Sequence, residues 1–162
     1  MIYLLRFLQA SAILIFQAFI APTFNVFGVT PNLFLPYVMF LGFFDENKYT
    51  AFILLSVFIA EDLLMPELLG LSSFMLLTIF FVVSFSGKSV NKDRFYVVAS
   101  LAFVFNLFYG IFFYLFGFFR TGSLLNLIIN SSVFIIYNSL FTVFALALFY
   151  FMSKLKITFK DA

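Results

Sequence analysis

Six long apolar stretches run along this chain, separated by short polar or charged segments. They predict helices over residues 2–21, 32–44, 49–64, 72–85, 95–119 and 131–152. Within each stretch the apolar run is nearly continuous, whereas a membrane β-strand alternates in polarity over segments of about ten residues. The pattern therefore predicts an all-α integral membrane protein, one polytopic domain (1–162) in which six transmembrane helices form a bundle.

The second stretch is too short to cross a bilayer as a straight helix. Residues 32–44 would span about 20 Å at 1.5 Å per residue, and the hydrocarbon core is about 30 Å thick. Pro36 also removes a backbone donor inside this stretch. Irregular backbone at membrane depth is tolerated only inside protein or along a wet cavity. We therefore expect this element to be kinked, covered by protein or extended by an irregular segment from Phe24.

The last apolar run, residues 124–152, is longer than a single span requires. We expect it to divide near Asn130 into an interfacial lead-in and a final helix. Four polar residues recur along it at intervals of four, eight and four: Asn126, Asn130, Asn138 and Thr142. Hydrogen bonds between helices, worth about 1 kcal/mol per contact, are the favoured explanation. A substrate path is less favoured because the stripe carries no charge.

Small residues share one face of the fifth predicted helix. Asn106, Gly110 and Gly117 follow one another at steps of four and seven. Small side chains at such spacing let two helices approach closely in lipid. Gly110 and Gly117 are therefore predicted to be helix-packing positions.

The composition supports a membrane environment and excludes the catalytic mechanisms that need Cys or His. The chain is 65% hydrophobic and only 10% charged, whereas about a quarter of the residues of a soluble domain are charged. It contains no Cys and no His, which removes thiolate nucleophiles, imidazole bases and the common zinc and haem ligands. We predict no catalytic, cofactor or metal site and no nucleic-acid partner, and an intramembrane enzyme is a weak third hypothesis.

Basic residues indicate the orientation of the predicted spans. With the N-terminus inside, Arg120 is the only one of the nine Lys and Arg residues that falls outside the cytoplasm, as the positive-inside rule requires. Tyr3, Tyr49, Tyr96 and Tyr150 fall at the same inner boundary, where an aromatic belt is expected. Both signals predict that the two ends of the chain are cytoplasmic (N-in/C-in).

Acidic residues gather where the third predicted helix meets the fourth. Glu61, Asp62 and Glu67 lie on the side opposite the basic segments. Acids at a helix C-terminus oppose its macrodipole, and ionisable residues near membrane depth are functional candidates. A solvated helix end, or a cap made by Asp62, remains an alternative. Because one helical step turns a side chain by about 100°, we expect Asp62 to point inward or toward a partner and Glu61 toward headgroups or water.

Three sequence patterns, in this order, resemble the rod shape-determining protein MreD family. The first is a Thr-Pro-Asn sequence that ends at Asn32 and leads into an apolar run. The second is Asp62, followed by a Leu-Gly pair that ends at Gly70. The third is a Tyr-Asn pair in the last helix, ending at Asn138. The resemblance covers nearly the whole chain.

The resemblance implies a non-enzymatic, multi-pass subunit of the bacterial cell-elongation (rod) complex in the cytoplasmic (inner) membrane. Such a subunit binds MreC and acts with the MreB filament, RodA and a class B penicillin-binding protein in peptidoglycan synthesis and cell-shape maintenance. Asp62, Gly70, Asn32 and Asn138 would be partner-binding or packing residues. The family also looks similar in fold to the substrate-binding subunits of energy-coupling-factor transporters.

That similarity supplies a second hypothesis, a vitamin-type substrate-binding subunit of a membrane transporter. Such a subunit needs a pocket at the outer face with convergent polar groups. The second helix and the interrupted junction at residues 57–73 could line one, as broken helices do in transporters. The predicted outer connections look short and apolar for a lid over a polar ligand, so this hypothesis ranks second.

Overall fold

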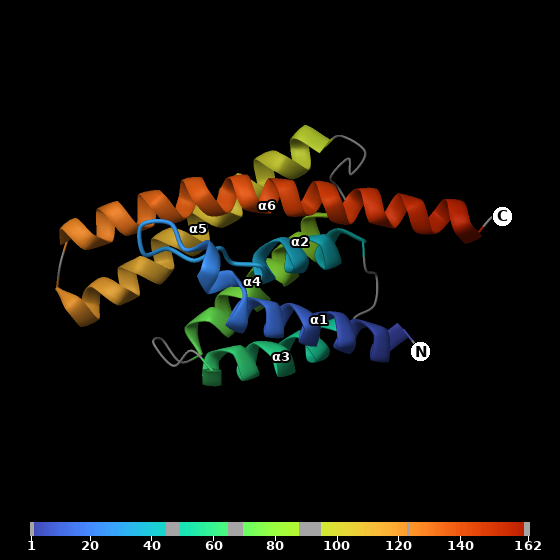
Figure 1. Cartoon of the computed structure of the whole chain (residues 1–162), viewed down its shortest axis with the longest axis horizontal. Coiled ribbons are helices and arrows are strands. Elements are labelled where there is room, and N and C mark those ends of the chain that lie inside the picture. The colour runs from blue at the N-terminus through green and yellow to red at the C-terminus, as the bar shows by residue number, and fades with distance from the viewer. Residues whose placement is uncertain (1, 45–48, 65–69, 88–94, 123, 161–162) are drawn as a thin grey trace.

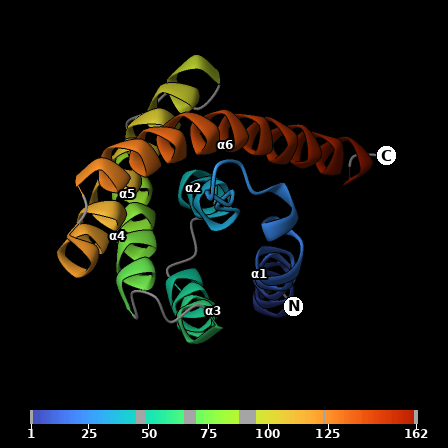
Figure 2. The ribbon, with the colours of Figure 1, turned by 60° about the vertical axis from the view of Figure 1, so that its left-hand side comes forward.

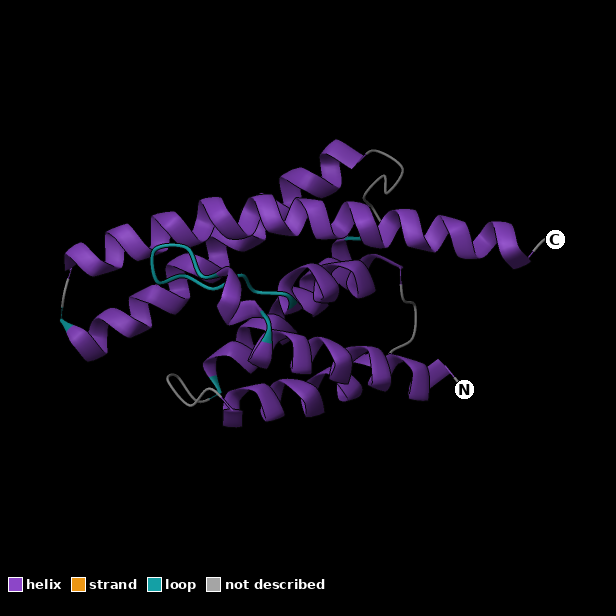
Figure 3. Cartoon of the chain, in the orientation of Figure 1, coloured by secondary structure: helices purple, strands orange, loops and turns teal. Residues whose placement is uncertain are grey.

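The computed structural model describes residues 2–44, 49–64, 70–87, 95–122 and 124–160, and these residues are almost entirely helical (Figures 1 and 3). The helices are α1 (Ile2–Phe19), the short 3-10 helix η1 (Ala21–Phe24), α2 (Phe34–Phe44), α3 (Thr50–Leu64), α4 (Leu71–Ser86), α5 (Phe95–Thr121) and α6 (Leu124–Lys160). The all-α prediction is confirmed for this part of the chain. The first helix ends two residues earlier than predicted, because the chain passes into η1, where Pro22 stands near the start.

The last helix differs from the prediction. α6 is one continuous helix of 37 residues, about 55 Å long, so the expected break near Asn130 is wrong. No Gly or Pro occurs between its ends, and Asn and Ser inside a helix each cost less than about 1 kcal/mol relative to Ala. Polar residues alone therefore do not interrupt its hydrogen-bond ladder.

Two helices are long and apolar enough to cross a membrane. They are α5, over Tyr96–Phe119, and α6, over Leu127–Phe151. Only 33% and 28% of their apolar windows are buried, whereas the core helix of a soluble protein would be mostly buried. Large apolar side chains such as Phe74, Phe85 and Phe119 are also exposed. By length and composition, α5 and α6 thus suggest a membrane protein, whereas the other described helices have at most 18 residues.

Successive helices run in opposite directions along the long axis of the bundle. In Figure 1 both ends of the chain lie on the right, as does the end of α2, while α3 ends and α6 begins on the left. Figure 2 shows α3 between α1 and α4, and α6 packed across α5. The end of α3 and the start of α4 thus lie on the side of the bundle opposite the two termini.

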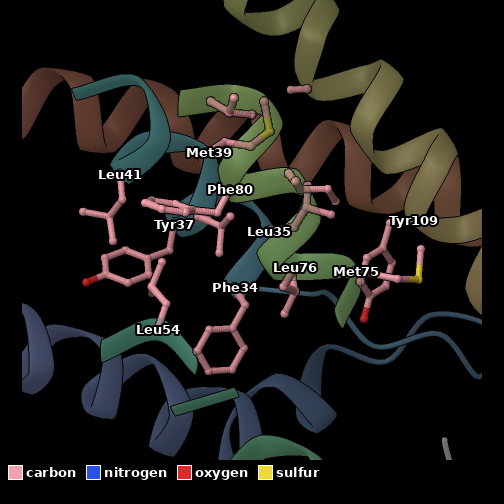
Figure 4. Packing of buried hydrophobic residues seen from close by; sticks show 14 of the residues in the cluster. Phe34, Leu35, Tyr37, Met39, Leu41, Leu54, Met75, Leu76, Phe80 and Tyr109 are labelled. Atoms are coloured by element: carbon pink, nitrogen blue, oxygen red, sulfur yellow. The ribbon is translucent and has the colours of Figure 1, made fainter. Parts of the chain in front are cut away.

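The short helix α2 is the centre of the fold, with the other helices arranged around it (Figure 2). Nine of its 11 residues are buried, and the core side chains of Figure 4 gather on it. One core contact is the edge-to-face pair of Phe34 with Phe58 of α3, with ring centroids 5.3 Å apart. A helix that is hydrophobic on every side is expected to be buried. Of the expected alternatives, cover by protein is confirmed for α2.

Two residues explain how α2 fits inside the bundle. Pro36 is the third residue of α2, in the first turn, where backbone N–H groups have no partner within the helix. Gly42 lies against α4, since a Cβ atom there would stand 2.7 Å from Val83 Cγ1. A proline at the start and a glycine at the close contact are therefore compatible with a tightly enclosed helix.

Candidate functional site

Two asparagines that lie far apart in the sequence accept hydrogen bonds at the N-terminus of α2. Asn32 Oδ1 accepts hydrogen bonds from the N–H groups of Phe34 at 3.0 Å and Leu35 at 3.1 Å. Asn138 of α6 accepts a hydrogen bond through Oδ1 from the backbone N–H of Asn32 at 2.5 Å. Both asparagines are buried. Two of the residues singled out in the sequence thus meet, and they connect α6 to the start of α2.

Gln17 of α1 also forms hydrogen bonds with the backbone just before α2. Its Nε2 donates to the carbonyl of Pro31 at 3.1 Å, and its Oε1 accepts from the N–H of Leu33 at 2.8 Å. The side chain is buried. Side chains thus satisfy the backbone donors at the start of α2, as burial requires.

Asp62 forms the corresponding cap on α4. Its Oδ2 accepts hydrogen bonds from the N–H of Gly70 at 3.2 Å and the N–H of Ser73 at 3.3 Å, and from the Ser73 hydroxyl. Gly70 precedes the first residue of α4 with φ of 85°, a conformation that favours glycine. A carboxylate at a helix N-terminus is stabilised by the macrodipole. Asp62 and Gly70 therefore join α3 to α4.

Glu61 is also buried, with 6% of its surface exposed, so the expectation that it faces headgroups or water is wrong. The physical reason is that α3 packs against both α1 and α4. Its buried arc is wide enough to include two adjacent positions. The Oε2 atom of Glu61 is buried and has no hydrogen-bond partner among the described residues.

Tyr109 of α5 contacts the capped helix α4. Its hydroxyl lies 2.9 Å from Ser72 Oγ of α4. The ring stacks on Phe113 and Phe134, with centroids 5.7 and 5.6 Å away. Buried hydrogen bonds thus join α5 to α4, in addition to those that join α6 to the start of α2.

Polar side chains also pair directly between α5 and α6. Thr142 Oγ1 donates to Asn106 Oδ1 at 3.5 Å, and Asn106 Nδ2 donates to the carbonyl of Ala102 at 2.9 Å. Asn106, Asn138 and Thr142 are fully buried, and Asn130 is partly buried. The side chain of Asn126 lies outside the described residues. Asn106 and Thr142 thus join α5 to α6, whereas Asn138 joins α6 to the start of α2.

The two glycines of α5 have different surroundings. A Cβ atom at Gly110 would lie 2.8 Å from Phe134 Cδ1 and 3.0 Å from Ile135 Cγ1 of α6, so the backbone there is close to the neighbouring helix. At Gly117 a Cβ atom would have no described atom within 4 Å. The close approach predicted for this face is therefore present at Gly110, whereas no described atom makes one at Gly117.

Sequence reasoning did not single out Gln17, Ser73 or Tyr109. Each is a polar residue within or beside an apolar run, and that signal could have marked Gln17 and Tyr109. Ser73 was indistinguishable from an ordinary helix-cap residue. Among the residues that the structure describes, no group of three or more His, Cys, Asp or Glu side chains could hold a metal ion.

Asn138→Leu should lower the free energy of unfolding by about 2 kcal/mol, because it leaves the buried N–H of Asn32 without an acceptor. Asn130→Leu, on the same helix and only partly buried, should change it by less than about 0.5 kcal/mol. Thermal unfolding in detergent, followed by circular dichroism at about 222 nm, measures both. Equal effects of the two substitutions would contradict this role of Asn138.

Comparisons with known proteins assign no family to the chain. No family model, curated protein or solved structure matches it.

Proposed function

We propose that this chain is a multi-pass subunit of the bacterial cell-elongation (rod) complex, of the MreD type, in the cytoplasmic (inner) membrane. In this proposal all six helices cross or enter the bilayer and both ends of the chain are cytoplasmic. The proposal is supported by the alternating helix directions (Figure 1) and by the distribution of Lys and Arg. Short helices such as α2 would be accommodated because the surrounding helices cover them.

One observation carries the assignment to this type of protein. The sequence patterns that resemble the MreD family come together as direct contacts: the Asn32 N–H with Asn138 Oδ1, and the Gly70 N–H with Asp62 Oδ2. Leu69 lies outside the described residues. Residues that close helix ends inside a bundle are required by the fold itself. Their contacts support a shared architecture with that family, and a shared function is inferred from it.

The proposed role is non-enzymatic. The chain would bind MreC within the membrane and so help to couple the MreB filament to RodA and a class B penicillin-binding protein during peptidoglycan synthesis. The exposed apolar faces of α5 and α6 suit contact with lipid or with the span of a partner. The buried hydrogen bonds between helices would give the bundle the rigidity that such a docking surface needs.

Coexpression with full-length MreC from the same source tests the proposal. The chain should copurify with MreC in mild detergent and should restore rod shape to cells depleted of their own MreD. MreC lacking its membrane span is the control, and it should be captured at least tenfold less (about 1.4 kcal/mol of association free energy). A folded chain that neither binds MreC nor restores rod shape would overturn the proposal.

A vitamin-type substrate-binding subunit is the second candidate. It is favoured by two of the four buried polar atoms that have no partner among the described residues, Glu61 Oε2 and Asn138 Nδ2, because ligand sites offer polar groups that are free to bind. Mass spectrometry of small molecules released from the purified chain separates the two functions. An organic ligand near one equivalent, without MreC binding, would favour the transporter subunit.

A further inference from the structure

The connection between α1 and α2 is exposed and uncharged. Residues 22–28 are all exposed, and among them are Phe24 at 55%, Val26 at 37% and Phe27 at 84%. The whole stretch of residues 7–44 contains no Asp, Glu, Lys or Arg. Large apolar side chains gathered at the tip of a connection are unfavourable in water and favourable against an apolar environment.

Hydrogen bonds to α6 fix the depth of this connection. The Tyr137 hydroxyl donates to the carbonyl of Phe24 at 2.7 Å, and Asn138 Oδ1 accepts from the N–H of Asn32. Tyr137 belongs to the apolar window Leu127–Phe151 of α6, about 15 Å along the helix from its start, and the hydrocarbon core is about 30 Å thick. Figures 1 and 3 show the connection alongside the first half of α6. In a bilayer that α6 crosses, the connection therefore lies at the depth of the hydrocarbon core.

The turn at the tip of the connection pairs its own backbone groups. Val26 and Val29 exchange two backbone hydrogen bonds, at 2.9 and 3.0 Å, and the N–H of Gly28 donates to Asn25 Oδ1 at 2.7 Å. An unpaired backbone N–H or C=O group is strongly unfavourable in lipid, which offers no hydrogen bonds. The internal pairing of this turn lowers that penalty, so the turn is suited to contact with acyl chains.

Phe27 occupies a backbone position that a turn in water usually gives to a different residue. Phe27 and Gly28 have φ of 51° and 83°, as the two central residues of a type I′ turn do. Asn, Asp and Gly are preferred there, and a positive φ is rare in a bulky residue. Among the residues that the structure describes, Phe27 is the only non-glycine residue with a positive φ. A ring at this strained and exposed position is stabilised when acyl chains cover it.

We propose that the tip of the α1–α2 connection, residues 24–28, is inserted among the lipid acyl chains of the leaflet on the side opposite the two termini, with Phe27 in direct contact with lipid. A stable protein interface uses about 20–30 residues on each side, and this short tip offers far fewer, so lipid is the favoured occupant. The inference needs α6 to cross a bilayer and is independent of the partner and the function proposed above.

Tryptophan fluorescence in lipid vesicles tests the insertion. The chain has no Trp, so Phe27→Trp places a single reporter at the tip. Phe144→Trp is the lipid reference, because Phe144 is an exposed residue within the apolar window of α6. Both variants are reconstituted in vesicles of phosphatidylcholine and phosphatidylglycerol, with and without bromine on the acyl chains. Brominated lipid should quench the fluorescence of Phe27→Trp as strongly as that of Phe144→Trp.

Iodide, which stays in water, provides the opposite test. It should quench Phe27→Trp at least about tenfold less than N-acetyltryptophanamide in the same buffer, because burial of a large ring favours the inserted position by at least that factor.

A second variant tests the sign of a stability change. Phe27→Asn replaces the ring with a residue that a positive φ favours. In lipid nanodiscs this substitution should lower the thermal midpoint, followed by circular dichroism, by about 3 °C or more, because the contact with lipid is lost. A tip that lies in water would instead give a rise.

Three results would overturn the proposal. Quenching of Phe27→Trp by iodide but not by brominated lipid would place the tip in water. Quenching by neither would mean that protein covers the tip, for example a second copy of the chain. A Phe144→Trp reference that brominated lipid leaves unquenched would remove the depth argument, because α6 would then not contact the acyl chains. Should Phe27→Trp not fold, the sign of the midpoint change in Phe27→Asn decides.

Discussion

Asp62→Ala is expected to lower the free energy of unfolding by about 3 kcal/mol, because three donors, two of them buried, lose their acceptor at once. These donors are the N–H groups of Gly70 and Ser73 and the Ser73 hydroxyl. The start of α4 would also lose the negative charge that its dipole favours. For a chain of this length the thermal midpoint should fall by roughly 10 °C.

Asp62→Asn is the matched control, since it keeps one oxygen acceptor and loses the charge. It should recover about half of the lost stability. Under the proposed function, Asp62→Ala should also impair MreC association because α3 is no longer joined to the start of α4. Thermal unfolding of the two variants in the same detergent, with MreC copurification alongside, measures both effects. Unchanged stability of Asp62→Ala would show that the cap contributes nothing to the fold.

Gly110→Leu is expected to prevent stable packing of α5 on α6, with a loss of at least about 3 kcal/mol. Even the Cβ atom of the new side chain would lie 2.8 Å from Phe134 Cδ1 and 3.0 Å from Ile135 Cγ1, well inside normal carbon contact. Overpacking of a filled interior costs typically about 1–3 kcal/mol, and leucine adds three further carbons. The yield of monodisperse protein in detergent and its thermal midpoint are the measurements.

Gly117 provides the control on the same helix. Because a Cβ atom there meets no described atom within 4 Å, Gly117→Ala should stabilise α5 by about 0.5–1 kcal/mol through helix propensity. Gly110→Ala should instead destabilise the chain. Phe112, which is exposed, should accept leucine without loss. The same sign of effect at Gly110 and Gly117 would refute the contact between α5 and α6 that the structure places at Gly110.

Part of the candidate site could be predicted from residue types alone. An acid near the end of an apolar helix and an asparagine before the first turn of another are recognisable as capping residues. Asp62 was found in this way and Asn138 as a polar residue inside an apolar run, whereas Asn32 was singled out only through the resemblance to the MreD family. Their partners were not, because Gln17, Ser73 and Tyr109 come from other turns and helices. Sequence spacing does not specify which helices are neighbours.

The two acids show the limit of reasoning from a single helix. A turn of about 100° separates Glu61 from Asp62, which predicts different surroundings if only one face of the helix is covered. In the structure α3 has neighbours on two sides, and both acids are buried. The width of a helix's buried arc depends on the number of its neighbours, and that number is a tertiary property.

The sequence by itself determined the helical class, the approximate helix positions and the exclusion of Cys and His chemistry, because these follow from local periodicity and composition. Only the tertiary structure decided that α2 is the enclosed centre and that Asn138 meets Asn32. It also decided that α5 approaches α6 closely at Gly110, while a Cβ atom at Gly117 would meet no described atom within 4 Å. The physical reason is that helix formation depends on hydrogen bonds within four residues. Burial and side-chain pairing instead depend on which distant segments share the same space.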